Sequence, residues 1–151
     1  MSFSIAFLDE PLSYPFDDAT TPAAYGELAI GNHREGFCAS LYEWSKEDYE
    51  SQWRHAIRSL LEGKDRAALI VEYISPLASW KLEWWPMYAV GETVFLQNHL
   101  LSYEQLTRPF SMQEPYTSLR DRKTINEDGN RISEWSVSFP EIEEFARSLG
   151  L

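Results

Sequence analysis

The clearest periodic pattern in the chain lies between Ser45 and Gly63, where apolar residues recur at helical spacing. Six apolar side chains fall on one stripe of an α-helix: Tyr49, Trp53, Ala56, Ile57, Leu60 and Leu61. The opposite face, which is expected to meet water, holds Asp48, Gln52, His55 and Ser59. Ser45 and Asp48 have capping-box spacing, and Gly63 is typical of a helix end. The pattern therefore predicts one long amphipathic helix over about residues 46–62.

A second helical pattern lies at the C-terminus. One helical face collects four apolar residues: Ile142, Phe145, Ala146 and Leu149. Ser138 and Glu141 again have capping-box spacing, and Gly150 follows the last periodic residue. A C-terminal helix is expected over about residues 140–149.

Shorter runs before the first helix predict strands. Residues 3–8 are expected to form a first strand, and the Pro- and Asp-rich residues 9–25 a surface loop. Residues 26–32 and 36–41 are expected to pair as a hairpin across Asn32–Glu35.

Two further strand patterns follow the first helix. Residues 66–75 form a nearly continuous apolar run, which is typical of a central strand covered on both faces. Residues 79–90 alternate, and the Gly-Glu pair at 91–92 predicts a hairpin turn into residues 93–98. Pro86 has no N–H to donate, so its strand must have an edge, a bulge or a break at that point.

Asp128 and Gly129 are a strong hairpin signal, because a type I′ turn needs positive φ at both central residues. The return segment Arg131–Val137 is expected to be extended and to place alternate residues on opposite faces. One face would hold Arg131, Ser133, Trp135 and Val137, and the other Ile132, Glu134 and Ser136. Neither face is purely apolar.

These elements predict an α+β fold: an antiparallel sheet of about five to seven strands, with one helix after the second or third strand and another at the C-terminus. A chain of 151 residues with 44% hydrophobic and 15% aromatic residues can bury one core. Residues 1–151 are therefore expected to form a single domain.

The net charge of −11 is concentrated near the start of the chain. The first 50 residues hold ten Asp or Glu and only two Lys or Arg. Such a surface repels phosphate backbones, so direct nucleic-acid binding is not expected, whereas a basic protein is a suitable partner. Alternating aromatics on the strands, Trp80, Trp84, Trp85, Tyr88 and Phe95, are interpreted as core residues rather than as a base-stacking platform.

Motifs for catalysis or cofactor binding are missing from the sequence. His33, His55 and His99 have no metal-ligand spacing, and the single cysteine, Cys38, is interpreted as a small apolar residue rather than a catalytic thiol. No metal, cofactor or enzymatic activity is expected. The start of the chain lacks the pattern of a signal peptide, and no apolar run reaches the length of a membrane span, so a cytoplasmic protein is expected.

Several sequence features occur in an order that resembles the immunity proteins of bacterial contact-dependent growth inhibition systems, in the group that guards against toxins cleaving small-subunit ribosomal RNA. The resemblance covers roughly residues 40–150. Its features are LYEWSKEDYESQW, AALIV, VFLQN, DGNRISEW and FARSL. The segment DGNRISEW is the most specific of these, and we call it the hallmark motif. Its hallmark positions are Asp128, Gly129, Ile132, Ser133, Glu134 and Trp135.

The resemblance implies a cytosolic binding protein without catalytic residues and a fold similar to the Whirly type. The implied partner is the cognate basic nuclease domain of a toxin, the C-terminal region of a large secreted protein. Because the first third of the chain is the most acidic and the least similar to the family, six of its carboxylates are the candidate partner-binding residues: Asp9, Glu10, Asp17, Asp18, Glu27 and Glu35. They could equally be solvated loop charges. A small enzyme with a spatially assembled site and a generic interaction domain remain as alternative functions.

Overall fold

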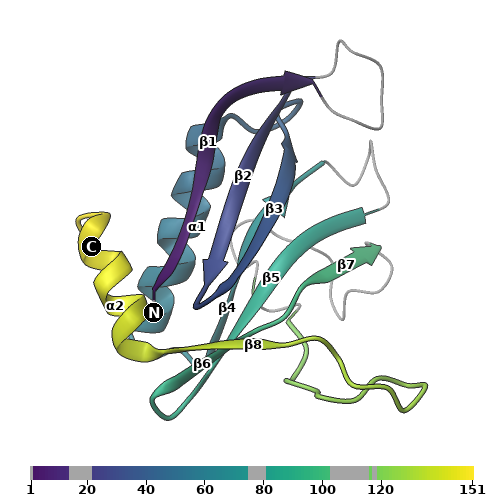
Figure 1. Cartoon of the computed structure of the whole chain (residues 1–151), viewed down its shortest axis with the longest axis vertical. Helices are drawn as coiled ribbons and strands as arrows, with labels where there is room; N and C mark the ends of the chain where they lie inside the picture. Colours follow the sequence, from purple (N-terminus) through teal and green to yellow (C-terminus); the bar gives the residue numbers. More distant parts are fainter. Residues whose placement is uncertain (1, 14–21, 75–80, 103–115, 117–118) are drawn as a thin grey trace.

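The computed structural model describes residues 2–13, 22–74, 81–102, 116 and 119–151 (Figure 1). The elements in chain order are β1 (Phe3–Ser13), β2 (Pro22–Ile30), β3 (His33–Ser40), α1 (Lys46–Leu61), β4 (Arg66–Glu72), β5 (Lys81–Val90), β6 (Thr93–Leu96), β7 (His99–Ser102), β8 (Trp135–Ser138) and α2 (Phe139–Ser148). The predicted α+β class and both predicted helices are confirmed.

The strands form two antiparallel sheets rather than the single sheet that was expected. The first sheet has the order β1-β2-β3, and the second has the order β4-β5-β6-β8, with β7 paired to β5. The described residues contain eight strands, one more than the upper end of the predicted range. Figure 1 shows α1 behind the first sheet and α2 beside the start of β1.

The loop predicted for residues 9–25 is wrong at both ends, because β1 continues to Ser13 and β2 begins at Pro22. Proline suggested a loop, yet the two prolines that lie within the strands occupy positions that strands tolerate. Pro11 follows a register shift on the edge strand β1, and Pro22 is the first residue of β2.

The predicted hairpin of β2 and β3 is confirmed, with a shorter turn than expected. Ile30 pairs with His33, so only Gly31 and Asn32 form the turn. Gly31 has φ +61° and no non-glycine residue in the described ranges has positive φ, which is the arrangement of a type II′ turn.

Helix α1 begins and ends where its sequence signals predicted. Ser45 is the N-cap in a reciprocal capping box with Asp48, and Gly63 follows the helix with φ +95°. The predicted apolar stripe is buried except for Leu61, which is half-buried. Gln52, however, is only 7% exposed, so its expected place on the water-facing side is wrong.

Gln52 is buried because it hydrogen-bonds the backbone of β4. Its Nε2 donates to the carbonyl of Ala68 at 2.8 Å, and its Oε1 accepts from the N–H of Ile70 at 2.8 Å. Trp53 Nε1 donates to the carbonyl of Ile70, also at 2.8 Å. The side chains of α1 thus bond to β4 in place of a neighbouring strand.

This arrangement corrects the expectation that residues 66–75 form a central strand. β4 is the last strand at its end of the second sheet, although six of its seven residues are buried. A continuous apolar run indicates burial of both faces, but it does not report which backbone edge has a strand beside it. The edge is protected from water by α1 instead.

Pro86 lies inside β5, which runs unbroken from Lys81 to Val90. The predicted break occurs in the neighbouring strands. β6 pairs with β5 only as far as Met87, and β7 takes over from Trp84. The missing N–H of Pro86 therefore falls where the partner strand changes, while its carbonyl accepts from the N–H of Gln97 at 3.1 Å.

A cluster of aromatic rings joins the first sheet to α1. Phe7 and Phe37 both pack against Trp53, with ring centroids 4.9 and 5.8 Å away, respectively. The ring of Phe37 also lies over Gly26, the residue opposite it on β2. A Cβ atom at Gly26 would come within 2.5 Å of the Phe37 Cε2 atom and 2.9 Å of the Ala6 carbonyl oxygen.

Gly26→Ala should therefore destabilise the protein by about 2 kcal/mol, because the Phe37 ring or the strand must shift to admit the methyl group. Gly36→Ala on the adjacent strand is the matched control, since its nearest neighbouring atom would be 3.8 Å away. Denaturant unfolding of both variants measures the difference. Equal stabilities of the two variants would show that the Phe37 ring does not constrain Gly26.

Gln52→Ala should cost on the order of 3 kcal/mol in the free energy of unfolding, because it leaves the Ala68 carbonyl and the Ile70 N–H without their helix partner. The control is Ser51→Ala, an exposed position on the same helix, where a change within about 0.5 kcal/mol is expected. If both variants unfold at the same denaturant concentration, the bonds from α1 to β4 contribute no net stability.

Candidate functional site

The chain reverses between Ile125 and Arg131, which form an isolated antiparallel bridge, so the predicted reversal is confirmed. The prediction of a type I′ turn is wrong. Gly129 has φ +82°, but Asp128 does not have positive φ. Asn126 shapes the turn: its carbonyl accepts from the Gly129 N–H at 3.1 Å, and its side-chain Oδ1 accepts from the Asp128 N–H at 3.0 Å. The turn therefore contains one residue with positive φ instead of two, and hydrogen bonds to the Asn126 side chain stabilise it.

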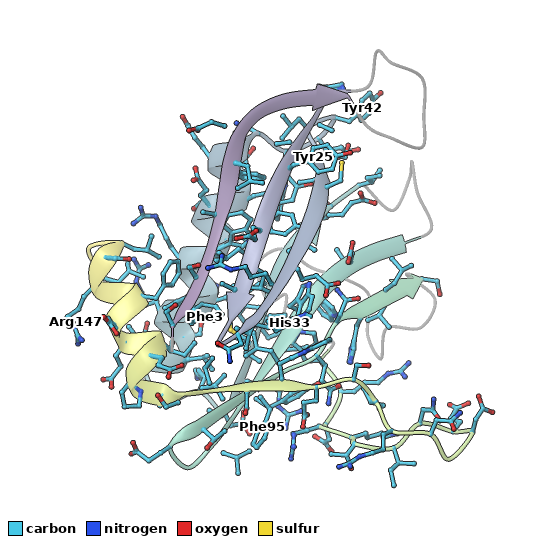
Figure 2. The ribbon with its side chains drawn as sticks, in the orientation of Figure 1. Phe3, Tyr25, His33, Tyr42, Phe95 and Arg147 are labelled. Atoms are coloured by element: carbon cyan, nitrogen blue, oxygen red, sulfur yellow. The ribbon has the colours of Figure 1, made fainter. Side chains whose placement is uncertain are left out.

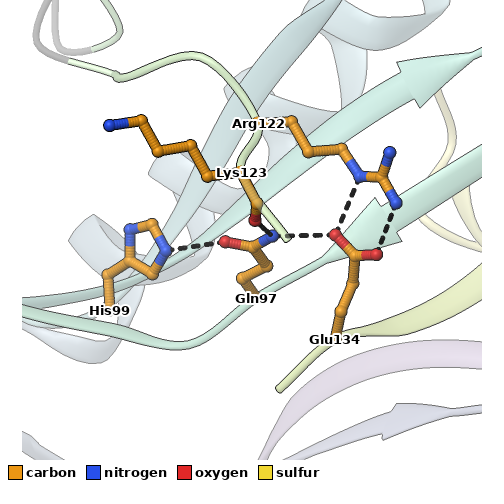
Figure 3. Close-up of polar contacts among 5 residues, drawn as sticks. All are labelled: Gln97, His99, Arg122, Lys123 and Glu134. Atoms are coloured by element: carbon orange, nitrogen blue, oxygen red, sulfur yellow. Dashed lines mark hydrogen bonds and ion pairs between the residues drawn. The ribbon is translucent and has the colours of Figure 1, made fainter. Parts of the chain in front are cut away.

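The return segment contributes Glu134 to a polar network of five residues, which we call the Gln97 network: Gln97, His99, Arg122, Lys123 and Glu134 (Figure 3). Glu134 accepts two hydrogen bonds from Arg122, one of them from Nε at 2.8 Å. Gln97 Nε2 donates to the same carboxylate at 2.8 Å. The Arg122 guanidinium also lies over the ring of Phe95, 3.8 Å from its centroid. Both oxygens of the Glu134 carboxylate therefore accept hydrogen bonds from other residues of the protein.

The orientation of the Gln97 amide determines the tautomer of His99. Gln97 is 1% exposed, and its nitrogen donates both to the Lys123 carbonyl and to Glu134, each at 2.8 Å. Its Oε1 must then accept, so His99 Nε2, 2.9 Å away, carries the proton. Burial, and then the positive charge of Arg120, lower the pKa of His99, so the ring is neutral at neutral pH.

The pKa of Glu134 reflects opposing effects. Partial burial raises it, but hydrogen bonds from Arg122 and Gln97, together with the positive charges of Arg122 and Arg131, outweigh burial and leave the pKa below its ordinary value. The same hydrogen bond from the Glu134 carboxylate raises the pKa of Arg122. The pair is fully ionised at neutral pH.

Trp135, the last residue of the hallmark motif, connects the two sheets. Its ring stacks on His33 at the start of β3, with centroids 4.4 Å apart and planes inclined by 15°. It also packs on Trp85 of β5 at 5.4 Å. Figure 2 shows His33 on the side of the first sheet that approaches the second. Since Trp135 is half-buried between these rings, its contacts are those of a structural residue that packs the two sheets together.

The six candidate carboxylates fall into three groups. Asp17 and Asp18 lie outside the described residues, and Glu10 lies on β1 without a described side chain. Asp9 is exposed on β1. Glu27 accepts from Arg34 Nη1 at 2.6 Å, and Glu35 lies 2.9 Å from His33 Nε2. The assignment of these residues to partner binding stays a prediction.

The strand register separates two of the candidates. Glu27 on β2 pairs with Gly36, whereas Glu35 on β3 pairs with Leu28. Directly paired residues of an antiparallel sheet share a face, so Glu27 and Glu35 lie on opposite faces of the first sheet. Glu35 instead lies next to the hallmark motif, through His33 and its stack on Trp135.

The three histidines do not meet in one place. His33 contacts Glu35, His99 contacts Gln97, and His55 Nδ1 lies 3.1 Å from the hydroxyl of Tyr116. In the described ranges, no three or more His, Cys, Asp or Glu side chains are grouped as metal ligands.

Cys38 lies half-buried on β3. Burial, followed by the negative charge of Glu72, raises the pKa of the Cys38 thiol, which disfavours a reactive thiolate. No helix in the described part of the chain has both the length and the apolar character needed to cross a bilayer.

Comparison with known proteins gives three concordant matches. The family model for the CdiI N-terminal domain matches residues 39–145. Immunity protein CdiI of Enterobacter cloacae subsp. cloacae is 27% identical over 122 residues, which cover 81% of this chain and 83% of the relative. A chain of the CdiA-CT/CdiI toxin and immunity complex from Enterobacter cloacae superposes with a TM-score of 0.86 and 26% identity, and the match covers 98% of both chains.

Glu134→Gln tests the Gln97 network through its pH dependence. Because the folded-state pKa of Glu134 is lowered, its ionised form stabilises the fold above the ordinary pKa of a glutamate, and this contribution is lost as the pH falls through the lowered value. The variant should be less stable than the wild type by about 1–3 kcal/mol at pH 7, and the difference should shrink on acidification.

The measurement is denaturant unfolding of both proteins between neutral and acidic pH. Glu144→Gln, at an exposed position on α2, is the control and should follow the wild-type curve. A stability difference between wild type and Glu134→Gln that did not change with pH would contradict an ionised, stabilising Glu134.

Proposed function

The chain belongs to the CdiI N-terminal domain family, and on this basis we propose that it binds and neutralises a cognate toxin of contact-dependent growth inhibition. The observation that carries the proposal is the structural match, which extends over 98% of both chains to a member of a toxin and immunity complex. The curated relative, which shares 27% identity, is itself an immunity protein.

The protein acts by binding rather than by catalysis in this proposal, and it acts in the cytoplasm. A binding role agrees with the use of Glu134 of the most specific motif and of the neighbouring His99 within the fold. Glu134 is bonded to Arg122 and Gln97, and His99 donates to Gln97.

The proposed partner is a basic nuclease domain that forms the C-terminal region of a large secreted protein. A nuclease must hold phosphate groups and therefore presents Lys and Arg. A protein of net charge −11 is attracted to such a surface and can compete with RNA for it. The match to a complex that contains a CdiA-CT toxin supports the toxin as partner and does not extend to its chemistry.

The carboxylates of the first third of the chain are the proposed contacts with this partner. Glu27 is available despite its pairing with Arg34, because the Arg34 side chain is 67% exposed and an exposed ion pair contributes little stability. Glu27 can exchange Arg34 for a toxin cation at small cost. Since Glu27 and Glu35 lie on opposite faces of the first sheet, only one of the two can lie at the centre of a flat interface.

We expect association with the toxin to become slower, and the association rate to depend less on salt, when six carboxylates are changed together to Asn or Gln. Exposed charges act mainly on the rate at which two proteins encounter each other. The six residues are Asp9, Glu10, Asp17, Asp18, Glu27 and Glu35. The measurement is the association rate with the cognate toxin domain, at low and moderate salt. Neutralisation of Glu141, Glu143 and Glu144 on α2 is a control for net charge.

The wild-type protein is the reference for both proposals. It should bind the toxin domain and restore growth of cells that express it. No binding and no protection would refute the neutralising function. Normal wild-type binding with an unchanged rate and salt dependence in the sixfold variant would discard only the carboxylate surface.

A further inference from the structure

Two adjoining hollows flank the return segment of the hallmark motif. The first, of about 300 Å³, is lined in part by Leu100 and Leu101 of β7 and by Lys123. The second, of about 390 Å³, includes Arg131. Ile132 lines both, so the two hollows adjoin at this residue, and we refer to them together as the Ile132 groove.

The Ile132 groove has an apolar floor that is open to solvent. Leu100 is 54% exposed, and the half-buried Leu101 and Ile132 continue the apolar surface. Ile125, at the base of the adjacent turn, is 56% exposed. Exposed large apolar side chains that adjoin a hollow are a common feature of protein docking sites.

The lining of the groove carries more positive than negative charge, in contrast to the protein as a whole. Its two lining carboxylates are neutralised from within, because Asp121 accepts from Arg66 at 2.9 Å and Glu134 accepts from Arg122. Lys123 and Arg131 are exposed and make no ion pair with any described residue. In Figure 3 the Lys123 side chain extends away from Glu134 on the side of His99. The lowered pKa of His99, due partly to Arg120, agrees with a positive potential there.

Most side-chain amide donors at the groove are already committed. Both N–H groups of Gln97 Nε2 donate, to Lys123 and to Glu134, and Asn98 Nδ2 donates to Glu83 at 3.0 Å. A phosphate group needs several converging donors, whereas a protein carboxylate next to an apolar side chain needs one or two cations and an apolar floor. The groove therefore fits an acidic protein segment better than a phosphate.

We propose that the Ile132 groove is a docking site for an acidic segment of the cognate toxin, with toxin Asp or Glu side chains beside Lys123 and beside Arg131 and an adjacent apolar side chain on Leu100 and Ile132. This inference rests on the proposed function. It adds a positively charged contact to the negatively charged contact proposed for the carboxylates of the first third of the chain. Two contacts of opposite sign fix the orientation of a partner, because a rotated partner would bring like charges together.

The test is the affinity of the full-length double variant Lys123→Gln/Arg131→Gln for the toxin domain. We expect the dissociation constant to rise about tenfold or more, chiefly through faster dissociation, because each toxin carboxylate would lose its buried partner. Lys64→Gln/Arg147→Gln is the matched control: it removes the same charge at exposed positions elsewhere and should bind within about twofold of wild type.

A second variant tests the apolar floor. Leu100→Ser removes an exposed side chain, so the melting temperature should be maintained while toxin affinity falls. Scanning the toxin carboxylates to Ala should then identify one whose effect is strongly non-additive with Lys123→Gln, as expected for a direct contact.

Four outcomes decide the proposal. Reduced affinity in the double variant and in Leu100→Ser, with a normal control, supports it. Wild-type binding with an unaffected double variant overturns the groove assignment and leaves the neutralising function intact, whereas a wild type that does not bind refutes the function itself. Saturable binding of inorganic phosphate that the double variant abolishes, together with unchanged toxin affinity, overturns it in favour of a small-anion site.

Discussion

The hydrogen bonds from one face of α1 to the backbone of β4 and its neighbours connect the two sheets. Gln52 and Trp53 bond to the edge of β4, and the Tyr49 hydroxyl both donates to the Ser40 carbonyl of β3 at 2.7 Å and accepts from the Tyr73 N–H at 3.0 Å. Tyr49 therefore bonds to both sheets from one side chain. An uncovered strand edge invites pairing with other chains, and here a helix removes that hazard without a further strand.

Features encoded by neighbouring residues were predictable from the sequence. The capping box of Ser45 and Asp48 and the hairpin turn at Gly91 depend on residues within a few positions of each other, and the structure contains both. Gln52 was not predictable in this way. Its place on the helix is polar by sequence, and its partners on β4 follow only from the tertiary register of helix and strand. The signal in the sequence was a polar residue beside an apolar stripe, and a residue in that position is equally consistent with exposure to water.

The hallmark motif shows the same limit at the site. Its reversal was predictable from Asp128 and Gly129, but the turn type depended on Asn126, whose side chain supplies the acceptor. The partners of Glu134 lie 12 and 37 residues away, at Arg122 and Gln97, so no local pattern could reveal them. For the acidic surface, composition located the charge near the start of the chain, while only strand register shows that Glu27 and Glu35 face opposite ways.

The pairing of β8 with β6 has a consequence for protein synthesis. β8 comes from residues near the end of the chain, yet it completes the second sheet beside β6, with Leu96 opposite Trp135. Until residues 134–138 have left the ribosome, β6 lacks this neighbour and Gln97 lacks Glu134. The second sheet, with the groove beside it, is therefore completed only once β8 has emerged, and a nascent chain that has not reached β8 carries an incomplete sheet.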